Sequence, residues 1–248
     1  MTKPEPITYG PSFMHYRCLG YEIHSEQAAK PSSQASQYVL SLIAAQGQMD
    51  ACLDYGCGRL RYAMALYRQS KALTVVDSAA QLDRSILIGR STTSVRKYVA
   101  AHWPRALAVD LGCFTPQKPL YDFALCANVL SAIPIYSDRI NALRNVSKAL
   151  KPNGRCLVIT QYTNSYFCSK KRDPTVVKFK DGFILGSETN ASFYGLIPLQ
   201  DLLRFVIKAG LVVESSWRHD QSAYVMCMPR REGQKEKGKE VTATKEKR

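Results

Sequence analysis

The sequence predicts an α/β protein with a doubly wound, mostly parallel seven-stranded sheet and an antiparallel hairpin at its C-terminal edge. Between about residues 50 and 161, short apolar runs alternate with helical stretches, and four of the first five runs end in Asp or Asn. Strand, helix and strand in succession favour parallel pairing with right-handed crossovers. A short turn separates the last two apolar runs, which favours the edge hairpin.

The individual elements follow from the spacing of apolar residues. The expected strands are 51–53, 73–76, 106–109, 123–127, 156–160, 211–214 and 224–227. Apolar residues at helical spacing predict helices within 38–43, 63–67, 139–150 and 198–209. The Pro and Gly at 152 and 154 stop the third of these helices.

The chain is expected to have three parts. Residues 1–34 mix Pro, Ser, Tyr and charge without a period, which predicts an irregular N-terminal arm with at most a short helix. Residues 35–229 form the main domain, in which an insertion at 162–196 breaks the alternation and carries a hairpin near 179–183. The Lys/Glu/Gly-rich residues 230–248 predict a disordered basic tail.

Size and composition favour one globular domain in the cytoplasm. A chain of 248 residues with 46% hydrophobic residues can bury one full core. We expect no membrane contact, because no window approaches about 18 uninterrupted apolar residues and the N-terminus lacks the apolar core of a signal peptide. The eight cysteines form no CxxC pair, which predicts no metal site and buried thiols in a reducing compartment.

The charge of the chain is strongly positive. The formal charge is +14, and the tail 230–248 contributes +4 through eight Lys/Arg and four Glu, which leaves +10 for the rest. Such a surface attracts polyanions, because neutralised phosphates release their counterions. Weak polyanion binding by the surface and tail is therefore expected, although solubility alone also explains the charge.

A glycine loop follows the first expected strand. The segment 53–59 reads LDYGCGR, and Asp77 ends the next strand 19 residues after Gly58. In open α/β folds such a loop lies at the carboxyl edge of the sheet, where ligands bind, and an acid at the following strand end can accept hydrogen bonds from ribose hydroxyls. Glycine turns also occur in NAD and flavin sites, so the loop alone does not choose among nucleotides.

The segment around this loop resembles class I, Rossmann-like methyltransferases over about residues 50–161. The loop is similar to their Asp/Glu-x-Gly-x-Gly motif, and further signatures are YDF at 121–123, NVL at 128–130 and LKPNG at 150–154. The resemblance implies S-adenosyl-L-methionine as cofactor and methyl transfer as activity. It implies contacts of the methionine part with Asp54, Gly56 and Gly58, of the ribose with Asp77, of the adenine with Asp110 and Leu111, and of the methyl-presenting face with Asn128.

Several alternatives stay open at this point. Many family members have a third glycine where this chain has Leu60, which could crowd the loop or pack against the first helix. A catalytically inactive cofactor- or nucleic-acid-binding module is therefore the second hypothesis. A nicotinamide oxidoreductase is the third, although Asp54 would be out of place beside a pyrophosphate. Asp110 could instead be a loop cap, and Asn128 a turn residue.

The methyl acceptor is not determined by these motifs. Residues 128–130 lack the Asn/Asp-Pro-Pro-aromatic pattern of amino-methylating DNA enzymes, and no Pro-Cys nucleophile follows. The insertion interleaves Lys and Arg with aromatic residues, which suits nucleic acid but equally a hairpin over a small-molecule pocket. The acceptor is thus a small molecule or is associated with nucleic acid. No catalytic residue is assigned; His24, Tyr162 and Tyr194 are candidate bases without an identified partner.

Overall fold

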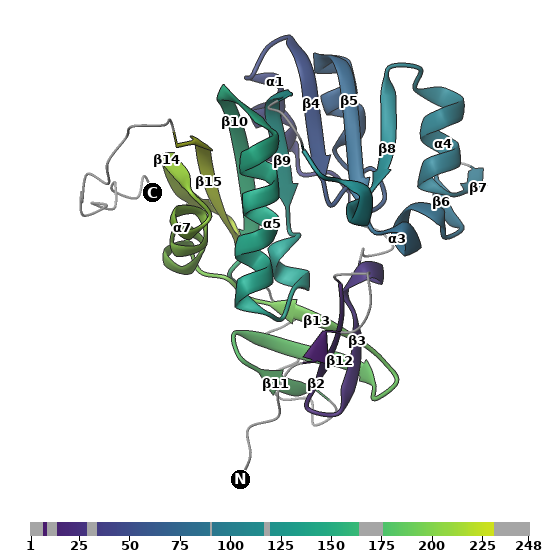
Figure 1. The fold of residues 1–248 in the computed structure, drawn as a ribbon, viewed down its shortest axis with the longest axis vertical. Coiled ribbons are helices and arrows are strands. Elements are labelled where there is room, and N and C mark those ends of the chain that lie inside the picture. The colour runs from purple at the N-terminus through teal and green to yellow at the C-terminus, as the bar shows by residue number, and fades with distance from the viewer. Residues whose placement is uncertain are drawn as a thin grey trace.

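The computed structural model describes residues 7–8, 14–28, 34–89, 91–116, 120–163 and 176–230, and Figure 1 shows their arrangement. A seven-stranded sheet has the order β14-β15-β10-β9-β4-β5-β8. Its strands are β4 Met49–Tyr55, β5 Ser70–Asp77, β8 Ala106–Asp110, β9 Tyr121–Ala127, β10 Leu150–Gln161, β14 Leu211–His219 and β15 Ser222–Pro229. All seven contain the expected runs, so the predicted fold class is confirmed.

The pairing directions also agree with the prediction. Strands β10, β9, β4, β5 and β8 pair in parallel, whereas β15 runs antiparallel to both β10 and β14. The C-terminal hairpin therefore closes one edge of the sheet through β15, and β14 becomes the edge strand.

Helices cover both faces of this main sheet. The helices are α1 Gln37–Ala44, α2 Ala63–Gln69, α3 Ala79–Asp83, α4 Val95–His102, α5 Tyr136–Ala149 and α7 Leu199–Lys208. Four of them, α1, α2, α5 and α7, correspond to the expected helices. The expected elements do not include the small hairpin of β6 Ile86–Ile88 and β7 Ser91–Thr93, nor the helices α3 and α4, which Ser78 and Ser94 cap at their N-termini.

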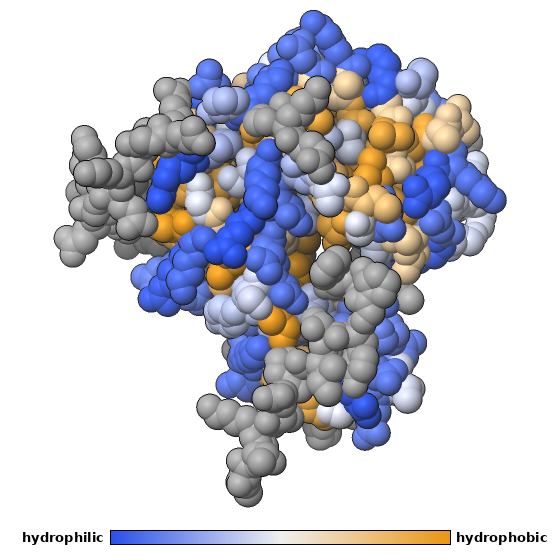
Figure 2. Space-filling view, viewed as in Figure 1, coloured by the Kyte–Doolittle hydropathy of each residue, from blue (hydrophilic) through white to orange (hydrophobic). Residues whose placement is uncertain are grey.

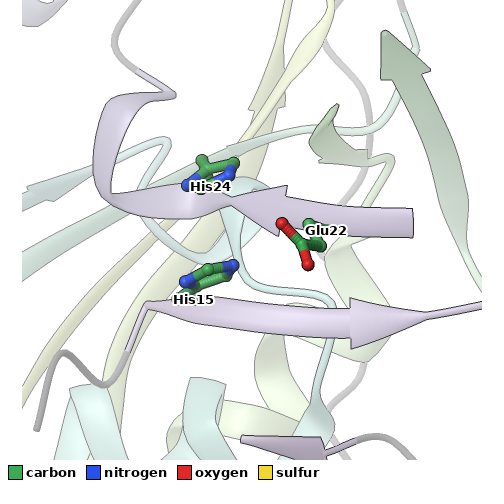
Figure 3. Close-up of side chains that lie close together, drawn as sticks. All are labelled: His15, Glu22 and His24. Carbon is green, nitrogen blue, oxygen red and sulfur yellow. The ribbon is translucent and has the colours of Figure 1, made fainter. Parts of the chain in front are cut away.

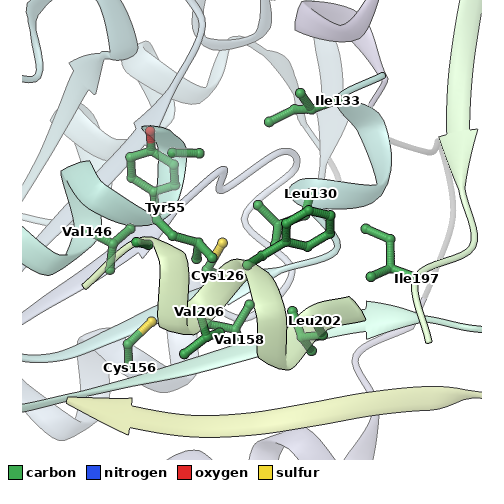
Figure 4. Packing of buried hydrophobic residues seen from close by; sticks show 14 of the residues in the cluster. Tyr55, Cys126, Leu130, Ile133, Val146, Cys156, Val158, Ile197, Leu202 and Val206 are labelled. Atoms are coloured by element: carbon green, nitrogen blue, oxygen red, sulfur yellow. The ribbon is translucent and has the colours of Figure 1, made fainter. Parts of the chain in front are cut away.

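Alternation along the central strands divides the core into two clusters. In β9, Ala124 and Cys126 belong to the cluster that α5 and α7 cover, whereas Phe123 and Leu125 belong to the one that α1, α2 and α4 cover. Figure 4 shows part of the first cluster, where side chains of both helices meet those of the central strands. A central strand buried on both faces explains why its sequence is a continuous apolar run.

A second sheet lies beyond one end of the main sheet (Figure 1). Its strands are β1 Ile7–Thr8, β2 His15–Cys18, β3 Tyr21–His24, β13 Asn190–Gly195, β12 Gly182–Ser187 and β11 Val177–Phe179, in the order β1-β2-β3-β13-β12-β11. The prediction of an irregular arm is therefore wrong for the described part of residues 1–34, which folds mainly into strands and the short 3-10 helix η1 Ser25–Gln27. The hairpin expected near 179–183 is present as β11 and β12.

One buried ion pair joins the second sheet to the main domain. Arg139 of α5 is fully buried, and its guanidinium donates to both carboxylate oxygens of Asp181, with an Nη2–Oδ1 distance of 3.0 Å. Its Nε donates to the carbonyl oxygen of Ile133 at 2.7 Å. Because Asp181 lies in the turn between β11 and β12, this pair fixes that hairpin against α5.

Two further sequence predictions concern the chain as a whole. The seven cysteines among the described residues are free, and all except the exposed Cys113 are buried, as expected for the apolar runs. In the described part of the chain, no helix has the length and apolar character needed to cross a membrane. The tail 231–248 and the basic cluster at 170–172 lie outside the described residues.

Candidate functional site

A cavity of about 1680 Å³ lies where the carboxyl ends of β4, β5 and β9 face the second sheet. Residues of the glycine loop form one wall, and Met14, Tyr16, Phe193 and Tyr194 of the second-sheet region form another. In Figure 2, apolar surface lies beside the hydrophilic outer face of α5. Ligand pockets commonly measure about 300–1,000 Å³, so this volume can hold more than one small molecule.

Close approach of two chain segments requires glycine at position 56. The backbone N–H groups of Gly56 and Cys57 both donate to the carbonyl oxygen of Val76, at 2.8 and 3.0 Å. Gly56 has a φ of +77°, and a Cβ atom there would lie 2.2 Å from Cγ2 of Val129. The loop after β4 is thus held against the ends of both β5 and β9.

The residue in place of the third glycine has a glycine-like backbone. Leu60 has a φ of +62°, and its side chain is 7% exposed within the cluster that contains Val39 and Leu66. It also contributes to the cavity wall. Of the two expectations for Leu60, the structure therefore supports packing against the helices, because most of its surface is buried there.

Asp77 and its neighbours organise the loop. Its carboxylate accepts hydrogen bonds from the N–H of Gly58 at 2.7 Å and from that of Ser78 at 2.8 Å. Gln81 donates through Nε2 to the carbonyl oxygen of Gly58 at 2.8 Å. Carboxylate oxygens can accept further bonds, so Asp77 retains acceptor capacity toward the cavity that it lines.

Of the two predicted acids at the strand ends, Asp54 is 4% exposed and Asp77 is partly buried. Burial raises the pKa of Asp54 to about 7, with a further increase from the negative charge of Asp77, and the positive charge of Arg61 opposes the shift. Burial also raises the pKa of Asp77 to about 6, against the lowering effect of the hydrogen bonds from Gly58 and Ser78. Neither side chain forms an ion pair within the described residues, so a cationic ligand would complement both.

Buried acceptors without a partner also line the cavity. Among the described residues, Oδ1 of Asn128, Oε1 of Gln81 and Oε2 of Glu26 are buried without a hydrogen bond. Asn128 has a φ of +62°, and its N–H donates to the carbonyl oxygen of Ile159 at 2.8 Å. Unpaired buried acceptors are unfavourable, so these groups fit a ligand rich in hydrogen-bond donors.

The structure brings most predicted site residues together, but not all. Asp54, Gly56, Gly58, Asp77, Leu111 and Asn128 all line the cavity. Asp110 pairs with Asp77 in the register of β5 and β8 but is not among the lining residues. Its carboxylate accepts from the N–H of Gly112 at 3.1 Å and caps the 3-10 helix η2 Leu111–Cys113, the alternative considered for this residue.

The three candidate bases occupy different positions. Tyr194 lines the cavity, and its hydroxyl donates to Oε1 of Gln161. Tyr162 lies outside the cavity wall and donates to the carbonyl oxygen of Asp220 at 2.8 Å. His24 also lies outside the wall and is paired with Glu26, Nδ1 to Oε1 at 2.8 Å.

The sequence does not predict the wall contributed by the second sheet. Tyr16, Glu26 and Phe193 all line the cavity, although they come from the segments expected to form an arm and an insertion. The sequence signal for part of this wall is Gly20, which lies between the two short segments that form β2 and β3 and takes a positive φ in the turn that joins them.

Comparisons with known proteins agree with this geometry. A family model described as a methyltransferase domain matches residues 26–215. The uncharacterized protein YmfD of Escherichia coli (strain K12) is 32% identical over 212 residues, which cover 86% of this chain and 95% of YmfD. The structure of PH0226 from Pyrococcus horikoshii OT3 has a TM-score of 0.61 at 11% identity, over 82% of this chain and 94% of that one. An S-adenosylmethionine-dependent methyltransferase from Clostridium acetobutylicum ATCC 824 has a TM-score of 0.55 at 14% identity, over 79% and 90%.

The fold and the cavity define an α/β protein with a large cavity at the carboxyl edge of a mostly parallel sheet. The family model covers more than half of the chain and includes every predicted site residue. The chain belongs to the methyltransferase-domain family, as its motifs predicted. Membership of this family agrees with the S-adenosylmethionine cofactor that the motifs imply.

Proposed function

We propose that this protein is an S-adenosylmethionine-dependent methyltransferase that acts on a small-molecule acceptor. The observation that carries the proposal is a pair of carboxylates on one wall of a cavity lined by a glycine loop: Asp54, which is 4% exposed, and the partly buried Asp77. S-adenosylmethionine supplies an electrophilic methyl group on a sulfonium, together with an ammonium and two ribose hydroxyls. The two acids and the unpaired acceptors suit those groups, whereas a pyrophosphate would be repelled by Asp54.

The residues of the chain would divide the binding task. Asp54, Gly56 and Gly58 border the space for the amino-acid part, because the glycines leave room beside the backbone. Asp77 accepts from the ribose hydroxyls. Leu111 offers an apolar surface to the adenine, and Asp110 acts indirectly by capping the turn that carries Leu111.

Positioning would provide most of the rate enhancement. Methyl transfer is an in-line displacement, in which the sulfur–carbon bond breaks as the acceptor–carbon bond forms, so alignment and exclusion of water dominate. Asn128 lies at the end of β9 with a constrained backbone, and its unpaired Oδ1 is suited to accept from the acceptor or the cofactor amine. An acceptor that must lose a proton also needs a base, and no residue is assigned that role.

The second sheet favours a small acceptor. Met14, Tyr16, Phe193 and Tyr194 line the cavity on the side of the second sheet. The volume of about 1680 Å³ exceeds that of ordinary single-ligand pockets, which leaves space beside the cofactor. A concave cavity with an apolar and aromatic wall is typical of sites for small organic molecules. The formal net charge of +10 on the residues outside the tail is the observation that favours a nucleic-acid-associated acceptor instead.

Cofactor binding is tested by calorimetry and thermal shift with S-adenosylhomocysteine, with NADH as the comparison ligand. A ligand at 100 times its Kd adds about 2.7 kcal/mol of stability, which corresponds to a rise of several degrees in Tm. Asp77→Ala should abolish this shift. The control Asp83→Asn removes an exposed acid that pairs with Arg96, and it should retain the shift. A shift with NADH alone would contradict the proposal.

The acceptor class is tested with labelled cofactor and a size-fractionated cell extract. Label in the low-molecular-weight fraction is the expected result. Label in the nucleic-acid fraction would show that the protein is a methyltransferase but that its acceptor is nucleic acid and not a small molecule. Binding of S-adenosylhomocysteine with no transfer of label to any fraction would favour the catalytically inactive module.

A further inference from the structure

We propose that His15, Glu22 and His24 form a binding site for one divalent transition-metal ion, of the kind that zinc occupies. The three side chains offer ligand atoms that all lie within 4.8 Å of one another. They belong to the β2–β3 hairpin of the second sheet, and none of them lines the methyltransferase cavity. The inference does not depend on the proposed methyl transfer.

The register of the hairpin brings these side chains to one face. His15 of β2 pairs directly with His24 of β3, and Glu22 lies two residues before His24. Because side chains alternate along a strand, Glu22 and His24 share a face with His15. Tyr16 and Ile23 point to the opposite, buried face. Figure 3 shows the two imidazoles facing each other across neighbouring strands with the carboxylate beside them.

The spacing needs only small changes to coordinate an ion. The two imidazole centroids are 4.3 Å apart, with an angle of 32° between the rings. In a tetrahedral site with ligands about 2.1 Å from zinc, neighbouring ligand atoms lie about 3.4 Å apart. His15, Glu22 and His24 are all partly exposed, so rotation about their side-chain bonds can close the difference.

The ligand types select among metals. Imidazole nitrogen is a borderline ligand that suits Zn²⁺, Co²⁺ and Ni²⁺, whereas Mg²⁺ and Ca²⁺ prefer oxygen. Two imidazoles with one carboxylate therefore favour the first group. Three protein ligands leave a coordination position that water can fill.

A second observation separates this cluster from an ordinary polar surface. Nδ1 of His24 is hydrogen-bonded to Oε1 of Glu26 at 2.8 Å. That bond fixes the imidazole ring and leaves Nε2 as the nitrogen for a metal. A carboxylate behind a ligating histidine is the usual outer-shell arrangement of metal sites, because it sets the tautomer and increases the basicity of the ligand. Glu26 is 8% exposed, so its own position is restrained.

The competing arrangement is a cross-strand ion pair. Arg17 faces Glu22 in the register of the hairpin. Its positive charge would hold Glu22 without any metal, and it opposes binding of a cation nearby. The carboxylate of Glu22 cannot ligate a metal ion and pair with Arg17 in the same way at once, so a direct binding measurement distinguishes the two arrangements.

Metal binding here would affect the methyltransferase cavity through Glu26. Glu26 lines the cavity, and its backbone carbonyl oxygen accepts from Oγ of Ser78 at 2.9 Å. Ser78 in turn caps α3 next to Asp77. An ion held by His24 would therefore stabilise the hairpin and the position of Glu26, which makes the site structural rather than catalytic.

The test uses full-length, tag-free protein that has been treated with a chelator. Isothermal titration with ZnCl₂ should show one ion per chain, and Zn²⁺ should raise the Tm. His15→Ala and His24→Ala should each weaken binding at least tenfold. The chain has four histidines, and His102→Ala is the matched control because His102 lies on α4, away from the cluster. This control should bind as the unaltered protein does.

Two further measurements distinguish ligation by this cluster from binding of the metal to a thiol. Titration with CoCl₂ should give an absorption spectrum without the thiolate charge-transfer bands of the near ultraviolet. Cys113→Ser should leave it unchanged, since Cys113 is the exposed thiol among the described residues. Glu22→Gln preserves side-chain shape, so a tenfold loss of affinity with an unchanged circular dichroism spectrum would support ligation. Absence of stoichiometric binding, or equal binding by the His15, His24 and His102 variants, would overturn the proposal.

Discussion

The two sheets of this protein are specified in different ways. In the main sheet, most neighbouring strands are linked by one strand–helix–strand unit or by the C-terminal hairpin, and only β4 with β9 and β10 with β15 pair over longer stretches of chain. The second sheet joins β3 to β13 through the pair Ile23 and Ala191, which are separated by most of the chain. The main sheet supplies the acids and the glycine loop, and the second sheet supplies the opposite wall of the cavity. One wall of the binding site therefore comes from segments with a recognisable local sequence pattern, and the other wall comes from segments that are far apart in the sequence.

The largest effect is expected where the two sheets are joined. Asp181→Ala should lower the free energy of unfolding by about 3 kcal/mol, because it leaves the fully buried guanidinium of Arg139 without its carboxylate. Denaturant titration measures the change. Asp201→Asn is the control, because its pair with Arg204 is exposed and should contribute less than about 1 kcal/mol. Equal losses in both variants would show that the buried pair does not join the sheets energetically.

The same difference between the sheets limits what the sequence alone predicts. Asp54, Asp77 and Asn128 can be identified because strand ends of a parallel sheet converge at one edge. Glu26 and Phe193 escape prediction because no local pattern indicates that the arm pairs with the insertion. The composition of the arm favours irregular structure, yet β3 is held in place by its partner strand β13. Tertiary pairing decides the structure of such segments more than their intrinsic propensity does.

A smaller effect is expected in the glycine loop of the main sheet. Gly56→Ala should cost about 2–3 kcal/mol of stability, because it combines a left-handed backbone with a Cβ atom 2.2 Å from Cγ2 of Val129. Since Val129 and Asn128 line the cavity, affinity for S-adenosylhomocysteine should fall at least tenfold. Denaturant titration and calorimetry measure the two quantities.

Gly47→Ala provides the matched control for that substitution. Gly47 also has a positive φ, +71°, but no atom of the described residues lies within 4 Å of the added Cβ. It should cost only about 1 kcal/mol and leave ligand affinity unchanged. If both variants lose the same stability, backbone conformation alone accounts for the effect, and close approach to Val129 contributes nothing.

The third effect, smaller than the first two, is a gain in stability that depends on pH. Burial raises the pKa of Asp54 to about 7, so the folded state binds its proton more tightly than the unfolded chain does. This favourable contribution is present at pH 4 and is lost as the pH rises toward 7. Asp54→Asn removes the buried charge and should stabilise the ligand-free protein by about 2 kcal/mol at pH 8, with little change at pH 4.

Ligand binding should favour the unaltered protein over Asp54→Asn, because the buried carboxylate that destabilises the free protein is the group proposed to contact the ligand. The carboxylate form of Asp54 complements a ligand ammonium, so affinity for S-adenosylhomocysteine should fall as the pH drops below about 6 to 7, where Asp54 and Asp77 become protonated. Asp54→Asn should lose most of this pH dependence together with affinity. The control Asp110→Asn, which can still cap η2, should retain both. Stabilisation by Asp54→Asn at pH 8 without loss of affinity would mean that Asp54 is buried for packing and does not contact the cofactor.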